Sequence, residues 1–368
     1  MGPAKILVIK LRSLGDTVIM TAPLKELIRA YPRSEIHVLV PSAWAPVLDG
    51  LSGIHKIWKL PPHSSKFGRI KVLARLALDL RRENYDWAIN FHASSSSANL
   101  VRATGAPIRS VHYHGHHHPN RHSTVTIPGK GILKPIIERD MDALRALGMD
   151  IPAGRSPEIQ LQPPELRTSQ NLLERLNLKS PVLGLSLGAS RPSKCWPIKN
   201  FASLAIEWCV EQNGAALALA GGSEESKIHE FLNHVNDLLP LSVHDPQLRA
   251  QVRTQITGTH ELSLRELAGT ISQFSVLAGN DSGPKHVGVA VGTPTVTLFG
   301  PEHPFEWHPY PIEHHPYLFI EPLSCRRDAD PGMPAWCGVS DCIQEKHRCM
   351  QMIEVDSVLA ECQRVARR

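Results

Sequence analysis

Short apolar runs alternate with stretches of helical periodicity along most of the chain. The apolar runs have the length of buried strands, and the stretches between them carry apolar residues three or four positions apart, as amphipathic helices do. Strands that alternate with helices predict right-handed crossovers and parallel sheets. The predicted strands are Lys5–Lys10, Ile36–Val40, Lys56–Leu60, Trp87–Phe91, Ser110–Tyr113, Pro181–Leu187, Ala215–Ala220, Gln255–Thr257, Val276–Gly279 and Thr295–Phe299. The predicted helices are Thr17–Tyr31, Trp44–Asp49, Arg69–Glu83, Ser96–Thr104, Ile136–Leu147, Lys199–Gln212, Glu224–Leu239, Ser263–Gln273 and Pro284–Val291.

The alternation is interrupted twice near the middle of the chain. Residues 114–135 are rich in His, Pro, Gly and Lys and predict a long exposed loop, whereas the Pro-rich stretch Pro152–Pro164 predicts a linker. Two βα-repeating halves joined by a linker predict two doubly wound α/β domains that face each other across a cleft. We place these domains at residues 1–160 and 175–350, and we expect residues 351–368 to form a C-terminal helix that packs back on the first domain.

Composition narrows the class of protein without identifying it. Of the 368 residues, 42% are hydrophobic and 20% are charged, a balance typical of globular proteins. The net charge of +5 is compatible with anionic partners, but it is too small and dispersed, with only 5% aromatic residues, to indicate nucleic-acid binding. The N-terminal apolar run is too short for a signal peptide. We therefore expect a cytoplasmic protein whose cysteines are thiols.

The richest strand-to-helix loop is Gly279–His286, in the second half of the chain. Pro284 suits the first position of a helix, and Gly283 allows the backbone to approach a ligand closely. Helix N-termini bind phosphate, and Ser282 would add a hydroxyl. Asp281 and Ser282 could instead serve only as helix caps, a role that is compatible with phosphate binding.

Two further loops of the same half carry polar side chains at strand ends. Leu187–Pro197 contains Ser190 and Lys194, which could hold a phosphate, although a solvated surface lysine is the alternative. Gly221–Glu225 contains a carboxylate that could bind ribose hydroxyls or merely complement a helix N-terminus.

In the first half, Leu11–Asp16 joins the first strand to the first helix. Asp16 could be an N-cap. It could also act as a general base, which requires a carboxylate near the acceptor hydroxyl.

These motifs, taken together and in order, resemble the heptosyltransferases of glycosyltransferase family 9, which assemble the inner core of bacterial lipopolysaccharide from ADP-heptose. The similarity runs over nearly the whole chain. The motifs that carry it are Leu11–Asp16 followed by Thr21-Ala22-Pro23, then Lys194-Cys195-Trp196-Pro197, then Asp281-Ser282-Gly283-Pro284-Lys285-His286, and last Pro294 with Phe299-Gly300-Pro301.

The resemblance implies a GT-B architecture of two Rossmann-like domains and an inverting, metal-independent transfer of heptose from ADP-heptose, with no cofactor. It assigns roles to the matching residues: Asp16 as catalytic base, Ser190 and Lys194 as diphosphate contacts, Glu225 rather than Glu224 near the nucleoside, Asp281 at the heptose hydroxyls, and Ser282, Gly283 and His286 in the phosphate cradle. Ala189, Gly288 and Glu302 depart from the usual family residues, which leaves the donor sugar and the acceptor open.

Several alternatives remain at this stage. A relative of autotransporter type would transfer heptose to protein, and another transferase would use another nucleotide sugar. A nucleotide-sugar epimerase can have the same architecture, and a catalytically silent nucleotide-binding module would keep only the donor site.

Three polar or basic segments carry weaker signals. The loop His112–Arg121 predicts acceptor contacts, a metal-binding tract or plain solvent exposure, and the candidate acceptor residues are Arg12, His116, His117 and Arg121. A C-terminal group of cysteines lacks the C-x-x-C spacing of a zinc ribbon, so we interpret them as free thiols with a metal site as the alternative. These cysteines are Cys325, Cys337, Cys342 and Cys349.

The predicted helix Arg69–Glu83 is basic and amphipathic. It could rest on the anionic inner face of the inner membrane, where a lipid-linked acceptor would lie, or simply present a solvated outer face. Its cationic residues are Arg69, Lys71, Arg75, Arg81 and Arg82.

Overall fold

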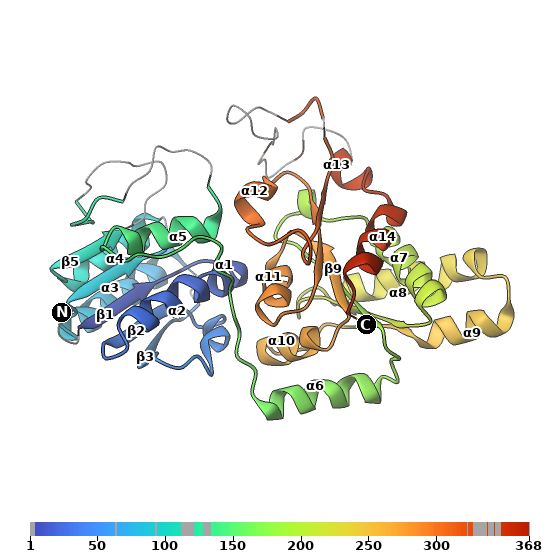
Figure 1. Ribbon diagram of the computed structural model, residues 1–368, viewed down its shortest axis with the longest axis horizontal. Coiled ribbons are helices and arrows are strands. Elements are labelled where there is room, and N and C mark those ends of the chain that lie inside the picture. Colours follow the sequence, from blue (N-terminus) through green and yellow to red (C-terminus); the bar gives the residue numbers. More distant parts are fainter. Residues whose placement is uncertain are drawn as a thin grey trace. The chain divides into compact units, whose positions relative to one another are not determined.

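The chain folds into two compact units, Met1–Gln160 and Leu161–Arg368 (Figure 1). The computed structural model describes residues 4–62, 65–92, 94–111, 121–127, 134–321, 323–326, 337, 342 and 347–367. Each unit is built on one parallel sheet with helical crossovers, as the alternating pattern predicts. Within the described ranges, no helix has the length and apolar character that crossing a bilayer requires.

The sheet of the first unit has the strand order β3-β2-β1-β4-β5. Its strands are β1 (Lys5–Ile9), β2 (Glu35–Pro41), β3 (Lys56–Leu60), β4 (Trp87–Asn90) and β5 (Ile108–Val111). Its helices are α1 (Leu14–Ile19), α2 (Thr21–Ala30), η1 (Ala45–Leu48), α3 (Lys66–Arg82), α4 (Ser95–Thr104) and α5 (Ile136–Arg145). Ile6, Leu7, Val8 and Ile9 are fully buried because β1 is the central strand, between β2 and β4.

The predicted helix Thr17–Tyr31 starts earlier in the structure and is divided into two helices. Helix α1 begins at Leu14 because Ser13 is its N-cap, with the Ser13 hydroxyl accepting from the Asp16 amide. A second helix, α2, follows after Met20. The interruption has a local cause: Pro23 has no N–H to donate to the carbonyl of Ile19, four residues earlier.

The sheet of the second unit has the strand order β11-β10-β9-β6-β7-β8, again entirely parallel. Its strands are β6 (Val182–Ser186), β7 (Ala215–Leu219), β8 (Ile256–Thr259), β9 (Val276–Asn280), β10 (Thr295–Phe299) and β11 (Tyr317–Phe319). Its helices are η2 (Pro192–Lys194), α7 (Ile198–Gln212), α8 (Glu225–Ser242), α9 (Pro246–Thr254), α10 (Leu264–Ser272), α11 (Gly283–Ala290), α12 (Pro304–Trp307) and α13 (Arg348–Gln351).

The stretch between the two predicted domains contains a helix of the second unit, α6 (Pro163–Arg175). Proline suits the first turn of a helix, so the Pro-rich stretch ends in a helix start. Helix α6 lies beside α10 (Figure 1), and Glu165 pairs with Arg265 at 2.6 Å. A Cβ at Gly269 would lie 2.3 Å from the Ser169 hydroxyl, so only glycine permits this close packing.

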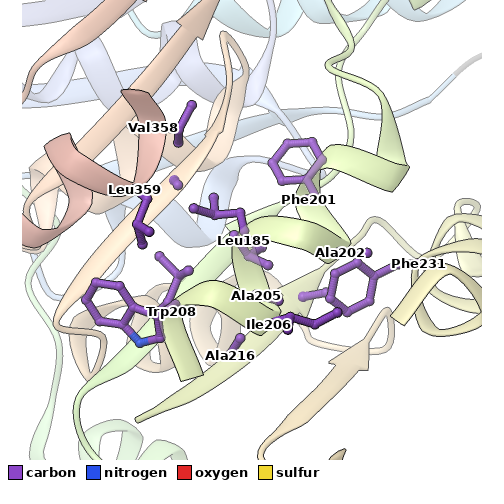
Figure 2. Close-up of a cluster of buried hydrophobic side chains, with 14 of the residues drawn as sticks. Leu185, Phe201, Ala202, Ala205, Ile206, Trp208, Ala216, Phe231, Val358 and Leu359 are labelled. Carbon is purple, nitrogen blue, oxygen red and sulfur yellow. The ribbon is translucent and has the colours of Figure 1, made fainter. Parts of the chain in front are cut away.

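The C-terminal helix α14 (Val355–Val365) packs against α7, β9 and β10 of the second unit, and its expected contact with the first domain stays a prediction. Its buried residues Val358 and Leu359 lie in the same apolar cluster as Trp208 of α7 (Figure 2). Cys362 is also fully buried there. The physical reason is that this amphipathic helix covers apolar surface of its own sheet next to β9 and β10.

Candidate active site

Asn280, at the end of β9, ties together the two main loops of the second unit. Its side-chain oxygen accepts from the Trp196 amide at 2.8 Å, and its side-chain nitrogen donates to the Leu187 carbonyl at 2.9 Å. The Trp196 indole also donates to the Ile353 carbonyl at 3.0 Å. The loop that carries Lys194 is therefore held next to the start of α11. Sequence reasoning expected an ordered loop from Trp196 but did not identify Asn280.

Asp281 lies between two lysines at the centre of this site. Its carboxylate pairs with the Lys194 ammonium and with the Lys285 ammonium, each at 2.5 Å. Burial would raise the pKa of the Asp281 carboxyl, but the two lysines outweigh it and hold the pKa well below its usual range. The three side chains thus carry one net positive charge at neutral pH, which favours binding of an anion.

Lys285 completes this cluster and was not assigned a role from the sequence. It is buried, donates to the Trp307 carbonyl at 2.9 Å and lies 4.4 Å from the centre of the Phe299 ring. Burial lowers the pKa of Lys285 to about 8, while Asp281 acts in the opposite direction. The ammonium is therefore predominantly charged at neutral pH and keeps Asp281 ionised.

The N-terminus of α11 adds hydrogen-bond donors beside the charged cluster. Ser282 is the N-cap residue by its backbone, but its side chain makes no capping hydrogen bond. Within the described part of the chain, the buried Ser282 hydroxyl has no hydrogen-bond partner. Because Asp281 is bound by lysines, neither side chain serves as the simple cap that we considered. A hydroxyl and the first-turn amides, including that of Gly283, are left for a ligand.

His286 lies one turn into α11 and contacts Tyr310 through its Nδ1 atom. Burial and the nearby Lys285 ammonium hold the pKa of His286 well below its usual range, so its ring is neutral. A neutral imidazole can offer a phosphate one N–H but no charge. Its expected place in the phosphate cradle stays a prediction, limited to that donor.

The two glutamates after β7 point in different directions. Glu224 accepts from the Gly221 amide at 3.1 Å, and a Cβ on Gly188 would lie 2.3 Å from the same Glu224 oxygen. Glu224 therefore lies against the loop that follows β6. The Glu225 side chain, chosen from the resemblance, is 60% exposed and lies near His229 and His260. Its role at the nucleoside stays a prediction.

The loop between β6 and η2 is fixed by an ion pair outside the cluster. Arg191 pairs with Glu302, one of the positions that departs from the family pattern. Ser190 precedes this arginine and is exposed, so its hydroxyl is accessible to a ligand. The predicted phosphate contacts Ser190 and Lys194 thus lie on one ordered loop.

In the first unit, Asp16 is not the N-cap that we considered but the third residue of α1. It is buried, accepts a hydrogen bond from the Ser13 hydroxyl at 2.5 Å, and lies 3.7 Å from the exposed Arg12 guanidinium. Its Oδ1 atom has no hydrogen-bond partner among the residues described, although the Lys10 ammonium is 3.9 Å away. As far as the described residues show, this carboxylate oxygen can accept a proton.

Lys10 and Asp140 form a buried ion pair behind Asp16 that sequence reasoning missed. Lys10 donates to Asp140 of α5 at 2.7 Å and to the Phe91 carbonyl at 2.9 Å. Burial raises the pKa of Asp140 to about 6, with Lys10 opposing the shift. The sequence feature that could have indicated this pair is Lys10 itself, a charged residue directly after the apolar strand.

We expect the substitution Asp140→Asn to lower the free energy of unfolding of the first unit by about 3 kcal/mol, because it leaves the buried Lys10 ammonium without its closest counter-charge. Urea denaturation at neutral pH measures the loss. The exposed Asp49 is the matched control, since Asp49→Asn should change stability by less than about 0.5 kcal/mol. A loss below about 1 kcal/mol for Asp140→Asn would contradict the importance of this pair.

A cavity of about 280 Å³ lies in the first unit, at the carboxyl ends of its strands. Its walls are mainly apolar, with Leu60, Pro62 and Leu73 among them. His92 and Arg69 supply polar groups, and the Arg69 guanidinium donates to the Ser96 hydroxyl at 2.9 Å. A pocket with apolar walls and a few polar groups is suited to an organic ligand.

The remaining predicted acceptor residues are only partly placed. Arg121 is exposed, and its Nε atom lies 3.3 Å from His122. His116 and His117 lie outside the described residues. The loop next to Arg121 is anchored on β5, since the Thr124 amide donates to the Arg109 carbonyl at 2.9 Å.

The C-terminal cysteines gather around one small cavity of about 10 Å³, together with Arg326 and Ser193. All four are free thiols: Cys325, Cys337, Cys342 and Cys349. Burial raises the pKa of Cys349 to about 11, which favours its protonated form. Over the described segments, no group of three or more His, Cys, Asp or Glu side chains is arranged to hold a metal ion.

Comparison with known proteins finds relatives of similar sequence and similar fold. Two Escherichia coli K12 enzymes are similar over 310 residues: lipopolysaccharide heptosyltransferase 2 at 27% identity and lipopolysaccharide heptosyltransferase 3 at 24%. Each alignment covers 82% of this chain and 84% or 83% of the relative.

Solved structures show the same fold. The E. coli ADP-heptose lps heptosyltransferase II matches with a TM-score of 0.69 and 21% identity, over 98% of both chains. The iron-containing dodecameric glycosyltransferase TibC of E. coli matches with a TM-score of 0.55 and 12% identity, over 98% of this chain and 77% of TibC. The predicted α/β fold with GT-B architecture, two Rossmann-like doubly wound parallel-sheet domains, is confirmed.

A family model covers most of the chain, including β6 to β11 and the charged cluster around Asp281. It describes glycosyltransferase family 9 (heptosyltransferase) and matches residues 73–329. The matched segment takes in Lys194, Asp281 and Lys285 but begins after Asp16. The chain therefore belongs to glycosyltransferase family 9, the heptosyltransferases, and is a glycosyltransferase.

Proposed function

We propose that the protein transfers heptose from ADP-heptose to a hydroxyl of a lipid-linked lipopolysaccharide inner-core acceptor, with inversion and without a metal ion. The observation that carries the proposal is the charged cluster at α11. Lys194, Asp281 and Lys285 leave one net positive charge beside a helix N-terminus. The adjacent Ser282 hydroxyl has no hydrogen-bond partner among the residues that the structure describes. That combination suits a diphosphate.

The second unit would hold the donor and stabilise its leaving group. When the bond between the anomeric carbon and the β-phosphate oxygen breaks, its electron pair stays on that oxygen. Lys194 and the amides at the start of α11 offer positive charge and hydrogen bonds for this negative charge. Fixed protein donors can therefore perform the stabilisation that a metal ion supplies in other transferases.

The first unit would supply the base. Asp16 would take the proton of the acceptor hydroxyl while the acceptor oxygen forms the new bond to the anomeric carbon. The buried carboxylate supports this role, because its Oδ1 atom accepts no hydrogen bond from any residue that the structure describes. Arg12 and Arg121 are exposed cations that could bind acidic groups of the acceptor. Such an acceptor places the enzyme in the cytoplasm, at the inner face of the inner membrane.

The proposal is tested by incubating the purified protein with a panel of nucleotide sugars and truncated core acceptors, followed by mass spectrometry. We expect a mass gain of one heptose only when ADP-heptose and a core acceptor are both present. Transfer from a different nucleotide sugar would show that the proposed donor is wrong. Transfer to a protein in place of the glycan would show that the proposed acceptor is wrong. Donor conversion without any acceptor would indicate an epimerase, and no conversion in any mixture would indicate a silent nucleotide-binding module.

A further inference from the structure

Helix α3 of the first unit presents large apolar side chains on its outward face. Phe67 is 78% exposed, Ile70 is 63% exposed and Leu78 is 61% exposed. Across the described residues, the other exposed large apolar side chains lie singly on different elements or loops, such as Leu241 at the end of α8. Scattered single residues are ordinary on protein surfaces, whereas three on one helix require an explanation.

The three residues form one stripe along the helix. An α-helix turns about 100° per residue, so Phe67, Ile70 and Leu78 fall within about 80° of one another. Leu76 and Leu80 project to the opposite side, where they are buried in the core of the first unit. The helix is therefore anchored by one apolar face while a second apolar stripe faces outward.

Cationic side chains flank this outward stripe. Lys71 and Arg75 are exposed and lie next to Leu78 around the helix, and Arg81 and Arg82 are exposed at its C-terminal end. Arg82 is paired with Asp79 at 3.2 Å. No ion pair of Lys71 or Arg75 occurs among the described side chains. The stripe thus has positive charge along its border and little negative charge to offset it.

We propose that the outward face of α3, defined by Phe67, Ile70, Leu78, Lys71 and Arg75, docks on an anionic lipid bilayer. A helix that lies in the bilayer interface has two parts. Its apolar side chains enter the region between headgroups and acyl chains, and its Lys and Arg side chains contact the headgroups. Long cationic side chains also reach back to the headgroups while their stems stay apolar.

A lipid surface fits this face better than a protein partner does. Three apolar side chains are far fewer than the roughly 20–30 residues that each partner contributes to a specific protein interface. A fluid bilayer needs no shape complementarity, and its anionic headgroups match the cationic border.

The same helix connects the docking face to the cavity of the first unit. Arg69 and Leu73 of α3 line that cavity, whose volume is about 280 Å³. These two residues lie on the side of α3 away from the stripe, so docking would hold the cavity about one helix diameter, roughly 10 Å, from the headgroups, where the sugar of a lipid-linked acceptor begins. This last step, unlike the docking itself, rests on the proposed function.

Vesicle cosedimentation of the full chain, without donor or acceptor, tests the docking. We expect binding to vesicles of phosphatidylglycerol and phosphatidylcholine, weaker binding to phosphatidylcholine alone, and weakening by salt. The triple variant Phe67→Ser/Ile70→Ser/Leu78→Ser should lose at least about tenfold in partitioning. Leu241→Ser, at a position 71% exposed in the second unit, is the matched apolar control and should bind like the wild type.

The charge requirement has its own pair of variants. Lys71→Glu/Arg75→Glu should lose at least about tenfold, because each basic residue near an anionic surface contributes about fivefold. Arg167→Glu/Arg175→Glu reverses the same number of exposed charges on α6 and should change binding by less than about twofold.

Three results would overturn the docking proposal. They are no vesicle binding by the wild type, equal binding to both kinds of vesicle, and equal losses in the α3 variants and their controls. Binding of an anionic protein by this face, without binding of vesicles, would also contradict the proposal. Transfer to a soluble, delipidated acceptor should survive in every α3 variant. Absence of that transfer in the wild type would count against the proposed function and leave the vesicle result unaffected.

Discussion

Replacing Asp16 with Asn should lower kcat for heptosyl transfer by about 10³-fold, while the affinity for ADP stays within about twofold. Asn keeps the size of the side chain but cannot take the proton of the acceptor hydroxyl, and general-base catalysis contributes about 10²–10⁴-fold. The Ser13 hydroxyl, which donates to Asp16, can donate equally to the Asn oxygen, so the local structure should persist. Initial rates with saturating donor and calorimetric titration with ADP measure the two quantities.

The variant Ser13→Ala provides the comparison for Asp16. It removes the hydrogen bond that orients the carboxylate but keeps the carboxylate, so its loss in kcat should be much smaller, about tenfold or less. If Asp16→Asn retained wild-type kcat, or if both variants lost the same activity, Asp16 would have a structural role and another group would be the base.

Replacing Lys194 with Gln should lower kcat/KM for the donor by about 10²-fold and weaken ADP binding. The substitution removes one positive charge from the place where the leaving diphosphate would develop negative charge, and single electrostatic donors of this kind contribute about 10²–10³-fold. The fold should survive, because Asp281 keeps its pair with the buried Lys285. Transfer rates, ADP titration and thermal unfolding separate these effects.

The matched control for Lys194 is Lys199, an exposed lysine five residues further on, in α7. Lys199→Gln removes the same charge from the same domain and should leave donor affinity and transfer rate within about twofold. A loss shared equally by both variants would indicate a long-range effect of net charge. An unchanged kcat/KM in Lys194→Gln would exclude Lys194 from the donor site.

Local pattern was sufficient for the strands and for most helices. All strands of the first unit were predicted to within a few residues, because each is an apolar run bounded by turns. Helix α6 was missed because Pro163 and Pro164 read as linker residues, although proline also suits a helix start. Strand β11 was missed because it is three residues long and depends on pairing with β10.

The motif residues were likewise identifiable one loop at a time, but not their partners. The sequence indicated Lys194 and Asp281 separately. Their contact, and the role of Lys285, exist only because two loops that are 87 positions apart in the chain meet at the end of one sheet. Asn280, which joins those loops, looked like an ordinary turn residue.

The amino-acid sequence alone determined that this protein is an α/β chain with two doubly wound halves. The spacing of apolar residues and the turn residues between them depend only on nearby positions in the chain. It also determined, through the motifs, the resemblance to heptosyltransferases. Only the tertiary structure decided that Lys10 is buried against Asp140 and that the stripe at Phe67, Ile70 and Leu78 faces outward. Burial and pairing depend on which distant segments pack together. The neighbours in space decide whether a charged side chain is paired and whether an apolar side chain is buried or exposed.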